Sequence, residues 1–200
     1  MRSPRSRFVP LTERTRDGVE LHWWPLAEPE EATEHSVGMA DELAQVIRCQ
    51  HPWLAVASID NAIFSGAIAA DDIRYIFGLV PELHQSLANQ VNGLAESGQE
   101  SVLRMILEEA KVNYDIQVTI PGVGRVDFVV EGCLVVEADS RLAHDGWERH
   151  VEDRRRDLQL AKRGYMSLRP AYQHTMHEPG LVAESVLGLL SQSSNFRRVL

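Results

Sequence analysis

Two different spacings of hydrophobic and polar residues follow one another along the chain. Over residues 37–96 apolar residues recur at helical spacing, with interruptions near His51-Pro52, near Ser65-Gly66 and at Pro81, which predicts a small bundle of about four helices. Residues 114–136 instead hold short runs of Val, Ile, Leu and Phe separated by turn residues, which is typical of strands. The pattern therefore predicts a helical part followed by an α/β part.

The second half is predicted to contain elements in the order α, β, β, β, α, β, α. A helix opens at Ser97, strands lie within 114–120, 125–130 and 134–139, and a helix over 145–162 leads to a strand over 165–169 and a last helix over 180–190. This order predicts an α/β fold with a mixed four-stranded sheet flanked by helices and an αβββαβ core. We expect an N-terminal extension over 1–35, a helical subdomain over 36–96 and the α/β domain over 97–200.

The helix predicted over 145–162 carries its apolar residues in one stripe, formed by Trp147, Val151, Leu158 and Ala161. Charged residues fill the positions between them. Gly164 follows as a left-handed cap that ends the helix.

Charge and cysteine content limit the classes of function. The chain has 29 Asp and Glu against 20 Lys and Arg, which argues against a protein that coats nucleic acid non-specifically. Residues 1–99 carry 7 basic and 14 acidic side chains, and residues 100–200 carry 13 and 15, so we expect any nucleic-acid contact from arginines of the second half. Cys49 and Cys133 form no CxxC pair, which favours a reducing cytoplasm. Asp60 and Asn61 interrupt the most apolar window, so we expect no membrane association.

Three carboxylates interrupt strands that are otherwise apolar. Glu137 and Asp139 follow Leu134-Val135-Val136, and alternation along a strand puts both on one face. If the preceding run pairs with this one as a hairpin across Glu131-Gly132, Asp127 joins them. Like charges ~4 Å apart repel by about 4 kcal/mol at an effective dielectric constant of about 20, so we expect a cation among them. Oxygen ligands without a nearby Cys or paired His favour Mg²⁺ or Mn²⁺.

Two further residues have both a structural and a chemical interpretation. Ser97-x-x-Glu100 is a capping box, which explains Glu100 without any chemistry, but a first-turn glutamate that faces the sheet also suits the acidic site. His144 follows Asp139 by five residues. A lone histidine is usually structural or on the surface, whereas beside a metal its near-neutral pKa suits proton transfer to a leaving oxygen.

A basic group lies in the helix after the acids. Arg154, Arg155 and Arg156 stand between Asp153 and Asp157, and Lys162, Arg163 and Arg169 extend the same region. One interpretation is a solvated helix face with local ion pairs. The other is a phosphate clamp, because guanidinium groups match the geometry of phosphate oxygens.

Taken in order, these residues resemble the very-short-patch-repair-like branch of the PD-(D/E)xK nuclease superfamily. The resemblance covers about residues 97–170 and lies in Glu100, Val126-Asp127-Phe128, Glu137-Ala138-Asp139, His144, 153–157, Gly164-Tyr165 and Leu168-Arg169. The chain has Asp139 where other members of the superfamily place a lysine. The stretch 37–96 resembles the helical middle of actinobacterial proteins related to abortive-infection antitoxin regulators, although the chain shows no winged-helix DNA reader.

This resemblance implies a restriction-endonuclease-like fold and a cytoplasmic, Mg²⁺- or Mn²⁺-dependent endonuclease that acts on DNA, with a role in phage defence. Asp127 and Glu137 would bind the ion with the carbonyl of Ala138, while Asp139 would orient a water or bind a second ion. His144 would protonate the leaving oxygen or position the phosphate, and Glu100 would add a carboxylate. Arg156 would hold the carboxylates or the scissile phosphate, and Arg154, Arg155 and Arg169 would contact nucleic acid.

Two alternatives share these residues. One is a non-catalytic nucleic-acid-binding or toxin-antitoxin regulatory protein that retains the nuclease fold, with the acidic first half docking onto another protein. The other is an RNA-cleaving toxin. The completeness of the acid set favours the enzyme, because an inactive site has no need to keep repelling charges together.

Overall fold

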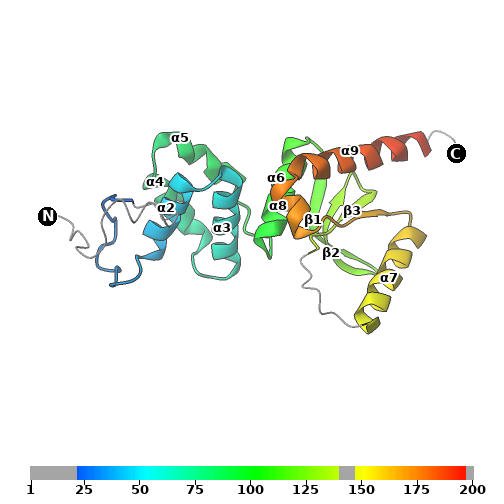
Figure 1. Ribbon diagram of the computed structural model, residues 1–200, viewed down its shortest axis with the longest axis horizontal. Helices are drawn as coiled ribbons and strands as arrows, with labels where there is room; N and C mark the ends of the chain where they lie inside the picture. The colour runs from blue at the N-terminus through cyan, green and yellow to red at the C-terminus, as the bar shows by residue number, and fades with distance from the viewer. Residues whose placement is uncertain (1–21, 140–146, 197–200) are drawn as a thin grey trace.

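The computed structural model describes residues 22–139 and 147–196, except for the side chains of 148–150 and 193–196. The helical part comprises α2 (Met39–Cys49), α3 (Pro52–Phe64), η1 (Ala70–Asp72), α4 (Ile73–Gly78), α5 (Glu82–Gln85) and η2 (Ser86–Gln90). The α/β part comprises α6 (Gly98–Glu109), β1 (Tyr114–Ile120), β2 (Gly124–Val130), β3 (Leu134–Val136), α7 (Trp147–Lys162), β4 (Met166–Leu168), α8 (Tyr172–His177) and α9 (Pro179–Phe196). The two parts lie side by side along the long axis, and α6 lies at the side of the α/β part that faces α3 (Figure 1).

The interruptions predicted in the helical part are confirmed. α2 ends at Cys49, and α3 begins at Pro52, where the missing proline N–H leaves no helical hydrogen bond unmade. Gly66, with φ of 74°, follows the end of α3, and Pro81 precedes α5. The buried faces of these helices form their own apolar cluster, which includes Leu43, Ile47, Ile59, Ile76 and Phe77. Of the helices that the structure describes, none combines the length and apolarity needed to span a membrane.

The sheet is mixed and four-stranded, as predicted, with strand order β1-β2-β3-β4. β1, β2 and β3 are antiparallel neighbours, and α7 connects β3 to the parallel strand β4. The turn between β2 and β3 is tight because Glu131 and Gly132 both have positive φ, 48° and 64°, the sign that such hairpin turns require. The chain thus follows the predicted order αβββαβ from α6 to β4.

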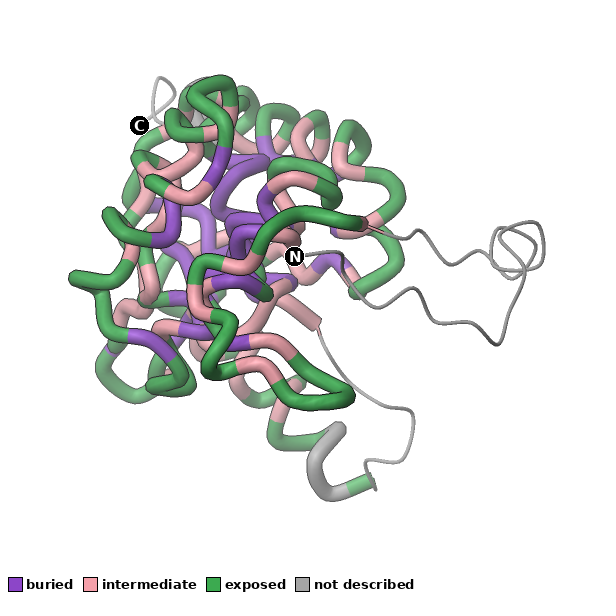
Figure 2. Tube along the Cα trace, turned by 90° about the vertical axis from the view of Figure 1, so that its left-hand side faces the viewer, coloured by how far each residue is buried: buried purple, intermediate pink, exposed green. Residues whose placement is uncertain are grey.

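Helices pack on both faces of the sheet. Figure 2 shows the buried residues gathered in the interior, with exposed residues around them. On one face Phe128, Val130, Leu134 and Val136 pack with α6 and α9. On the other face Val129 and Val135 pack with Leu160 of α7. The apolar stripe predicted for α7 was expected to pack on the sheet, but it faces solvent. Its residues Trp147 and Leu158 are 77 % and 70 % exposed, whereas Leu160, which is not in the stripe, is fully buried.

The long hairpin of β1 and β2 changes the face that it presents near Gln117. Ile116 pairs with Phe128, and both pack in the cluster with α6 and α9. Val118 pairs with Val126, yet these two pack in the cluster with α7. Residues two apart on a regular strand share a face, so the hairpin twists between these two pairs. Gln117 lies at that point with a left-handed φ of 55°.

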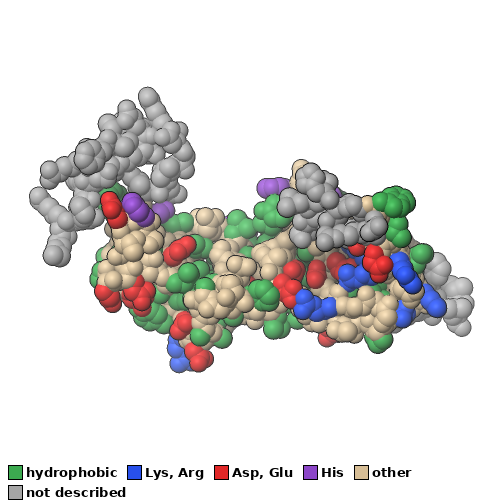
Figure 3. All heavy atoms as spheres, turned by 90° about the horizontal axis from the view of Figure 1, so that it is seen from below, with side chains coloured by type: hydrophobic (Ala, Val, Ile, Leu, Met, Phe, Trp, Pro, Cys, Tyr) green, Lys and Arg blue, Asp and Glu red, His purple; other side chains and the backbone are tan. Residues whose placement is uncertain are grey.

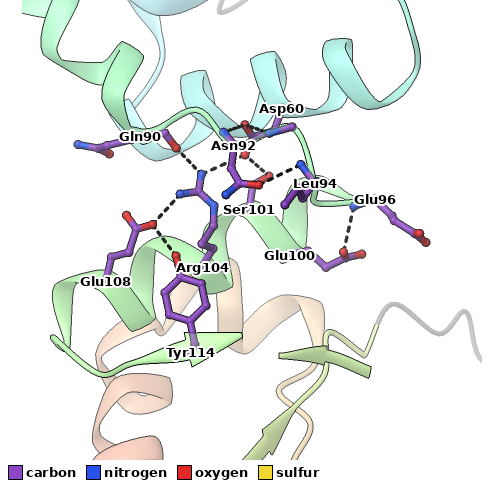
Figure 4. A network of polar contacts seen from close by, with 11 residues as sticks. Asp60, Gln90, Asn92, Leu94, Glu96, Glu100, Ser101, Arg104, Glu108 and Tyr114 are labelled. Carbon is purple, nitrogen blue, oxygen red and sulfur yellow. Dashed lines mark hydrogen bonds and ion pairs between the residues drawn. The ribbon is translucent and has the colours of Figure 1, made fainter. Parts of the chain in front are cut away.

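A buried ion pair joins the helical part to α6. Asp60 of α3 is fully buried, and its Oδ2 accepts hydrogen bonds from Arg104 at 3.1 Å and from Ser101 at 2.8 Å. Oδ1 accepts the backbone N–H groups of Asn92 and Gly93, at 2.8 and 3.0 Å. Figure 4 shows these contacts between α3, the segment before α6, and α6 itself. The network joins α3 to α6, the helix that carries Glu100.

Candidate active site

The register between β2 and β3 brings Asp127 and Glu137 together. Phe128 pairs with Val136, so Asp127 and Glu137 occupy the next opposed positions of the hairpin. The backbone N–H of Ala138 donates to Oδ2 of Asp127 at 2.8 Å. The predicted hairpin across Glu131-Gly132 therefore exists, and it has the predicted effect on these two acids.

A pocket of about 240 Å³ opens at this point, lined by Arg125, Asp127, Glu137, Ala138, Asp139, Arg156 and Arg169. Asp139 reaches it because its backbone continues the parallel pairing past β4, with its N–H donating to the carbonyl of Pro170 at 3.2 Å. In Figure 3 acidic and basic side chains lie next to each other on this half of the molecule. The structure thus gathers in one pocket the three predicted acids, Ala138 and two of the predicted arginines.

Asp127 is the acid whose ionisation the fold disfavours most clearly. Its pKa is raised from 3.8 to about 6, first by burial and then by the negative charges of Glu100 and Glu137. The hydrogen bond from Ala138 and the positive charge of Arg156 oppose this rise only in part. Burial is therefore the main reason why Asp127 is harder to ionise, and the two neighbouring carboxylates add to its effect.

Glu137, unlike Asp127, lies in direct contact with positively charged groups. Nη2 of Arg156 donates to its Oε1 at 2.7 Å, and Nε of Arg169 donates to its Oε2 at 2.9 Å. Both carboxylate oxygens of this buried residue are thus bound by guanidinium groups. Holding a carboxylate is one of the two roles that the sequence suggested for Arg156.

Glu100 forms the capping contacts that the sequence predicts, and it is not among the residues that line the pocket. Its Oε1 accepts from the hydroxyl of Ser97 at 2.9 Å, its Oε2 accepts from the N–H of Glu96 at 3.0 Å, and its own N–H donates to Ser97. These are helix-capping contacts. The same carboxylate lies close enough to Asp127 to raise the pKa of that residue.

The remaining arginines differ in how they are held. Arg154 is exposed and pairs with Asp157 at 2.9 Å, and Arg155 is exposed on the same helix. Arg169 pairs with Asp157 as well as with Glu137. Arg156 and Arg169 therefore line the pocket, whereas Arg154 and Arg155 lie on the outer surface of α7.

One predicted residue and two unpredicted ones complete the description. His144 lies outside the described residues.

Arg125 lines the pocket and forms an ion pair with Glu96. Gln117 lies opposite Asp127, and its Nε2 donates to Oε2 of Glu100 at 2.9 Å. Sequence reasoning missed Gln117 because it occupies an ordinary polar position between Ile116 and Val118, and it missed Arg125 because an arginine before an apolar run is common.

The donor set fits a hard cation in part. Asp127 supplies a carboxylate whose Oδ2 is bound to Ala138 and whose Oδ1 accepts no hydrogen bond from the described residues. Within 22–139 and 147–196, no three His, Cys, Asp or Glu side chains are placed as a ready-made metal site. A cation here would therefore use Asp127 together with the second lone pairs of Glu137 and neutral oxygens.

No protein-family model, no curated protein and no solved structure matches this chain.

Proposed function

We propose that this protein is a Mg²⁺- or Mn²⁺-dependent endonuclease with a restriction-endonuclease-like fold, and that it hydrolyses phosphodiester bonds in DNA. One observation carries the proposal. Asp127, whose ionisation is disfavoured, lies opposite Glu137 in a pocket whose rim is formed by Arg125, Arg156 and Arg169. Such a pocket suits a divalent cation and an anionic substrate together. The cation would neutralise the carboxylates, and the guanidinium groups would neutralise the substrate.

Each group has a role in this proposal. Asp127, Glu137 and the Ala138 carbonyl would hold the cation. When bound, the cation would lower the pKa of water and neutralise charge on the phosphate. Asp139 would orient the attacking water, and the guanidinium groups at the rim would bind phosphate oxygens, which they match in geometry.

A plasmid assay tests the proposal. Supercoiled plasmid is incubated with the full chain and Mg²⁺ or Mn²⁺, with an EDTA control and with labelled RNA in parallel. We expect nicking that EDTA abolishes and that Asp127→Asn reduces at least about 100-fold, the scale on which acid–base and metal groups contribute. The matched control is Asp115→Asn, which removes an exposed acid from β1 of the same hairpin and leaves activity unchanged. Equal activity of the wild type and Asp127→Asn would contradict the proposal, and cleavage of RNA alone would assign it to RNA.

A second candidate, a non-catalytic nucleic-acid-binding protein, is favoured by one observation. Both oxygens of Glu137 are already bound by Arg156 and Arg169, so this acid is neutralised without a cation. In that case the chain binds DNA equally well in EDTA and in Mg²⁺, and cleaves neither strand. A gel-shift measurement beside the plasmid assay separates the two candidates.

A further inference from the structure

Both carboxylate oxygens of Glu137 are held from α7, one directly and one through a second arginine. Nη2 of Arg156 donates to Oε1 at 2.7 Å, and Nε of Arg169 donates to Oε2 at 2.9 Å. Arg169 follows β4 directly, and its Nη1 forms an ion pair with Oδ1 of Asp157. Asp157 is the residue after Arg156, so two neighbouring positions of one helix reach the two oxygens of Glu137.

The register between β3 and β4 explains why Arg169 lies beside Glu137. Val136 pairs with Leu168 in the parallel pair, so Glu137 and Arg169 are the next residues along the two chains. The backbone N–H of Glu137 donates to the carbonyl of Leu168 at 3.1 Å, which continues that pairing. The backbone does not fix where the guanidinium group of Arg169 lies, because an arginine side chain has many rotamers.

Asp157 supplies this missing constraint. Its Oδ1 is buried and accepts no hydrogen bond from the residues that the structure describes, so its contact there is the ion pair with Arg169. Its Oδ2 pairs at 2.9 Å with Arg154, whose side chain is 57 % exposed. The side chain of Arg169 is only 16 % exposed, and solvent screens an ion pair less where burial excludes it. The pair with Arg169 is therefore the better shielded of the two.

Stability alone is a weak reason for this arrangement. Leu160 already packs α7 against Val129 and Val135 of the sheet, and ion pairs at a partly exposed site add little to the free energy of unfolding. The larger effect is on geometry, because a carboxylate at a reactive site has to be held within about 0.5 Å of its working position. Residues behind such a carboxylate commonly provide this support.

We infer that Asp157 is a positioning residue of the candidate site, which acts through Arg169 to fix the carboxylate of Glu137 in the pocket. Asp157 is not among the residues that line the pocket, so it acts from behind them. The inference rests on the proposed function, because it needs the reaction in which Glu137 takes part. It deepens that function by making the geometry of Glu137 depend on where α7 lies.

The test measures plasmid nicking by the full chain at saturating plasmid, so that weaker DNA binding does not enter the rate. Asp157→Ala removes the ion pair and keeps a residue that favours a helix. We expect its nicking rate to fall about 10-fold, as on loss of other groups that support a site from behind. The plasmid concentration that gives half the maximal rate should stay within about 2-fold of the wild type. A purely structural role would lower the melting temperature and leave the rate of the folded protein unchanged.

Two more variants sharpen the result. Asp157→Asn has the same shape and lacks the charge, so it repeats the measurement with the least disturbance of packing and should lose rate in the same direction. Glu152→Ala is the matched control, because Glu152 is an exposed acid of the same helix. It should nick at the rate of the wild type.

A double-mutant cycle in melting temperature tests the route through Arg169 without any activity. If the two residues act as a pair, adding Asp157→Ala to Arg169→Gln lowers the melting temperature less than adding it to the wild type. Equal losses in the two backgrounds would overturn the inference, because Asp157 would then act by another route.

The outcomes separate this inference from the proposed function. If the wild type nicks plasmid and both Asp157 variants nick it at the same rate, the inference is overturned and the proposed function stands. A loss of rate in Glu152→Ala as large as that in Asp157→Ala would also overturn it, because any negative charge on α7 would then have the same effect. If the wild type cleaves neither DNA nor RNA, both are overturned.

Discussion

Asp127 accepts a 2.8 Å hydrogen bond from the backbone of Ala138, yet its carboxyl group is harder to ionise in the fold than in the unfolded chain. Burial and the charges of Glu100 and Glu137 outweigh that hydrogen bond and the positive charge of Arg156. This balance makes a prediction about how stability depends on pH.

Without metal, the stability contribution of Asp127 should fall as the pH rises. Its pKa is about 6 in the fold against 3.8 for an unperturbed aspartate, so the contribution is fully present below about pH 3.8 and is lost as the pH rises through about 6. Asp127→Asn keeps an oxygen for Ala138 and removes the charge. We therefore expect this variant to exceed the wild type in free energy of unfolding by about 1 kcal/mol at pH 8, a value reduced for partial exposure, and by about half as much at pH 5.

Urea unfolding in EDTA at several pH values measures this difference. Asp115→Asn is the control, since Asp115 is exposed on β1. A difference between Asp127→Asn and the wild type that stays constant from pH 5 to pH 8 would show that Asp127 ionises freely in the fold.

Removal of Arg156 should change the affinities for the cation and for nucleic acid in opposite directions. Nη2 of Arg156 neutralises Oε1 of Glu137 at 2.7 Å, so Arg156→Gln leaves the pocket more negative. We expect Mn²⁺ to bind about 10-fold more tightly, since about 1.4 kcal/mol of repulsion from a cation is removed. DNA should bind more weakly, with the salt dependence of binding reduced by about one counterion.

The exposed Arg155 of the same helix supplies the comparison. Arg155→Gln should weaken DNA binding with a similar change in salt dependence and leave Mn²⁺ binding unchanged. Calorimetry and fluorescence anisotropy measure the two affinities. Weaker Mn²⁺ binding by Arg156→Gln would contradict the view that Arg156 and the cation compete for Glu137.

The sequence predicted the sheet because local signals for it agree. The turn residues Glu131-Gly132 set the β2–β3 hairpin, and once that register exists, Asp127 and Glu137 must oppose each other. The signals for the helix cap at Ser97 and for the left-handed Gly164, with φ of 81°, also lie in residues that are neighbours in the sequence. Residues paired through local turns are therefore predictable without a structure.

The features that could not be predicted depend on contacts distant in sequence. The bond of Arg169 to Glu137 spans 32 residues, and no spacing rule connects these two residues. The twist at Gln117 gives no signal, because its polar side chain fits the alternation of β1. Such departures from local preference are expected where a site imposes its own geometry.

The ion pair between Asp60 and Arg104 should be the most sensitive polar contact in the described part of the chain. Both side chains are almost fully buried, at 0 % and 2 % exposure. Arg104→Met leaves the carboxylate of Asp60 buried without its charge partner, so we expect a loss of about 3–5 kcal/mol in free energy of unfolding. Arg154→Met, which breaks an exposed pair with Asp157, should cost at most about 1 kcal/mol. Urea unfolding compares them, and similar losses would show that the buried pair is not essential.

The orientation of α7 provides a last prediction, because its apolar stripe faces away from the sheet. Arg156 reaches the pocket from this helix, and Leu160 is its fully buried apolar anchor, while Leu158 is 70 % exposed. Leu160→Ala should therefore lower the free energy of unfolding by about 2–5 kcal/mol, because it leaves a cavity against Val129 and Val135. Leu158→Ala should change it by no more than about 0.5 kcal/mol. Urea unfolding of the two variants settles which face of α7 packs on the sheet. A larger loss for Leu158→Ala would mean that the helix is rotated, and Arg156 would then no longer point to Glu137.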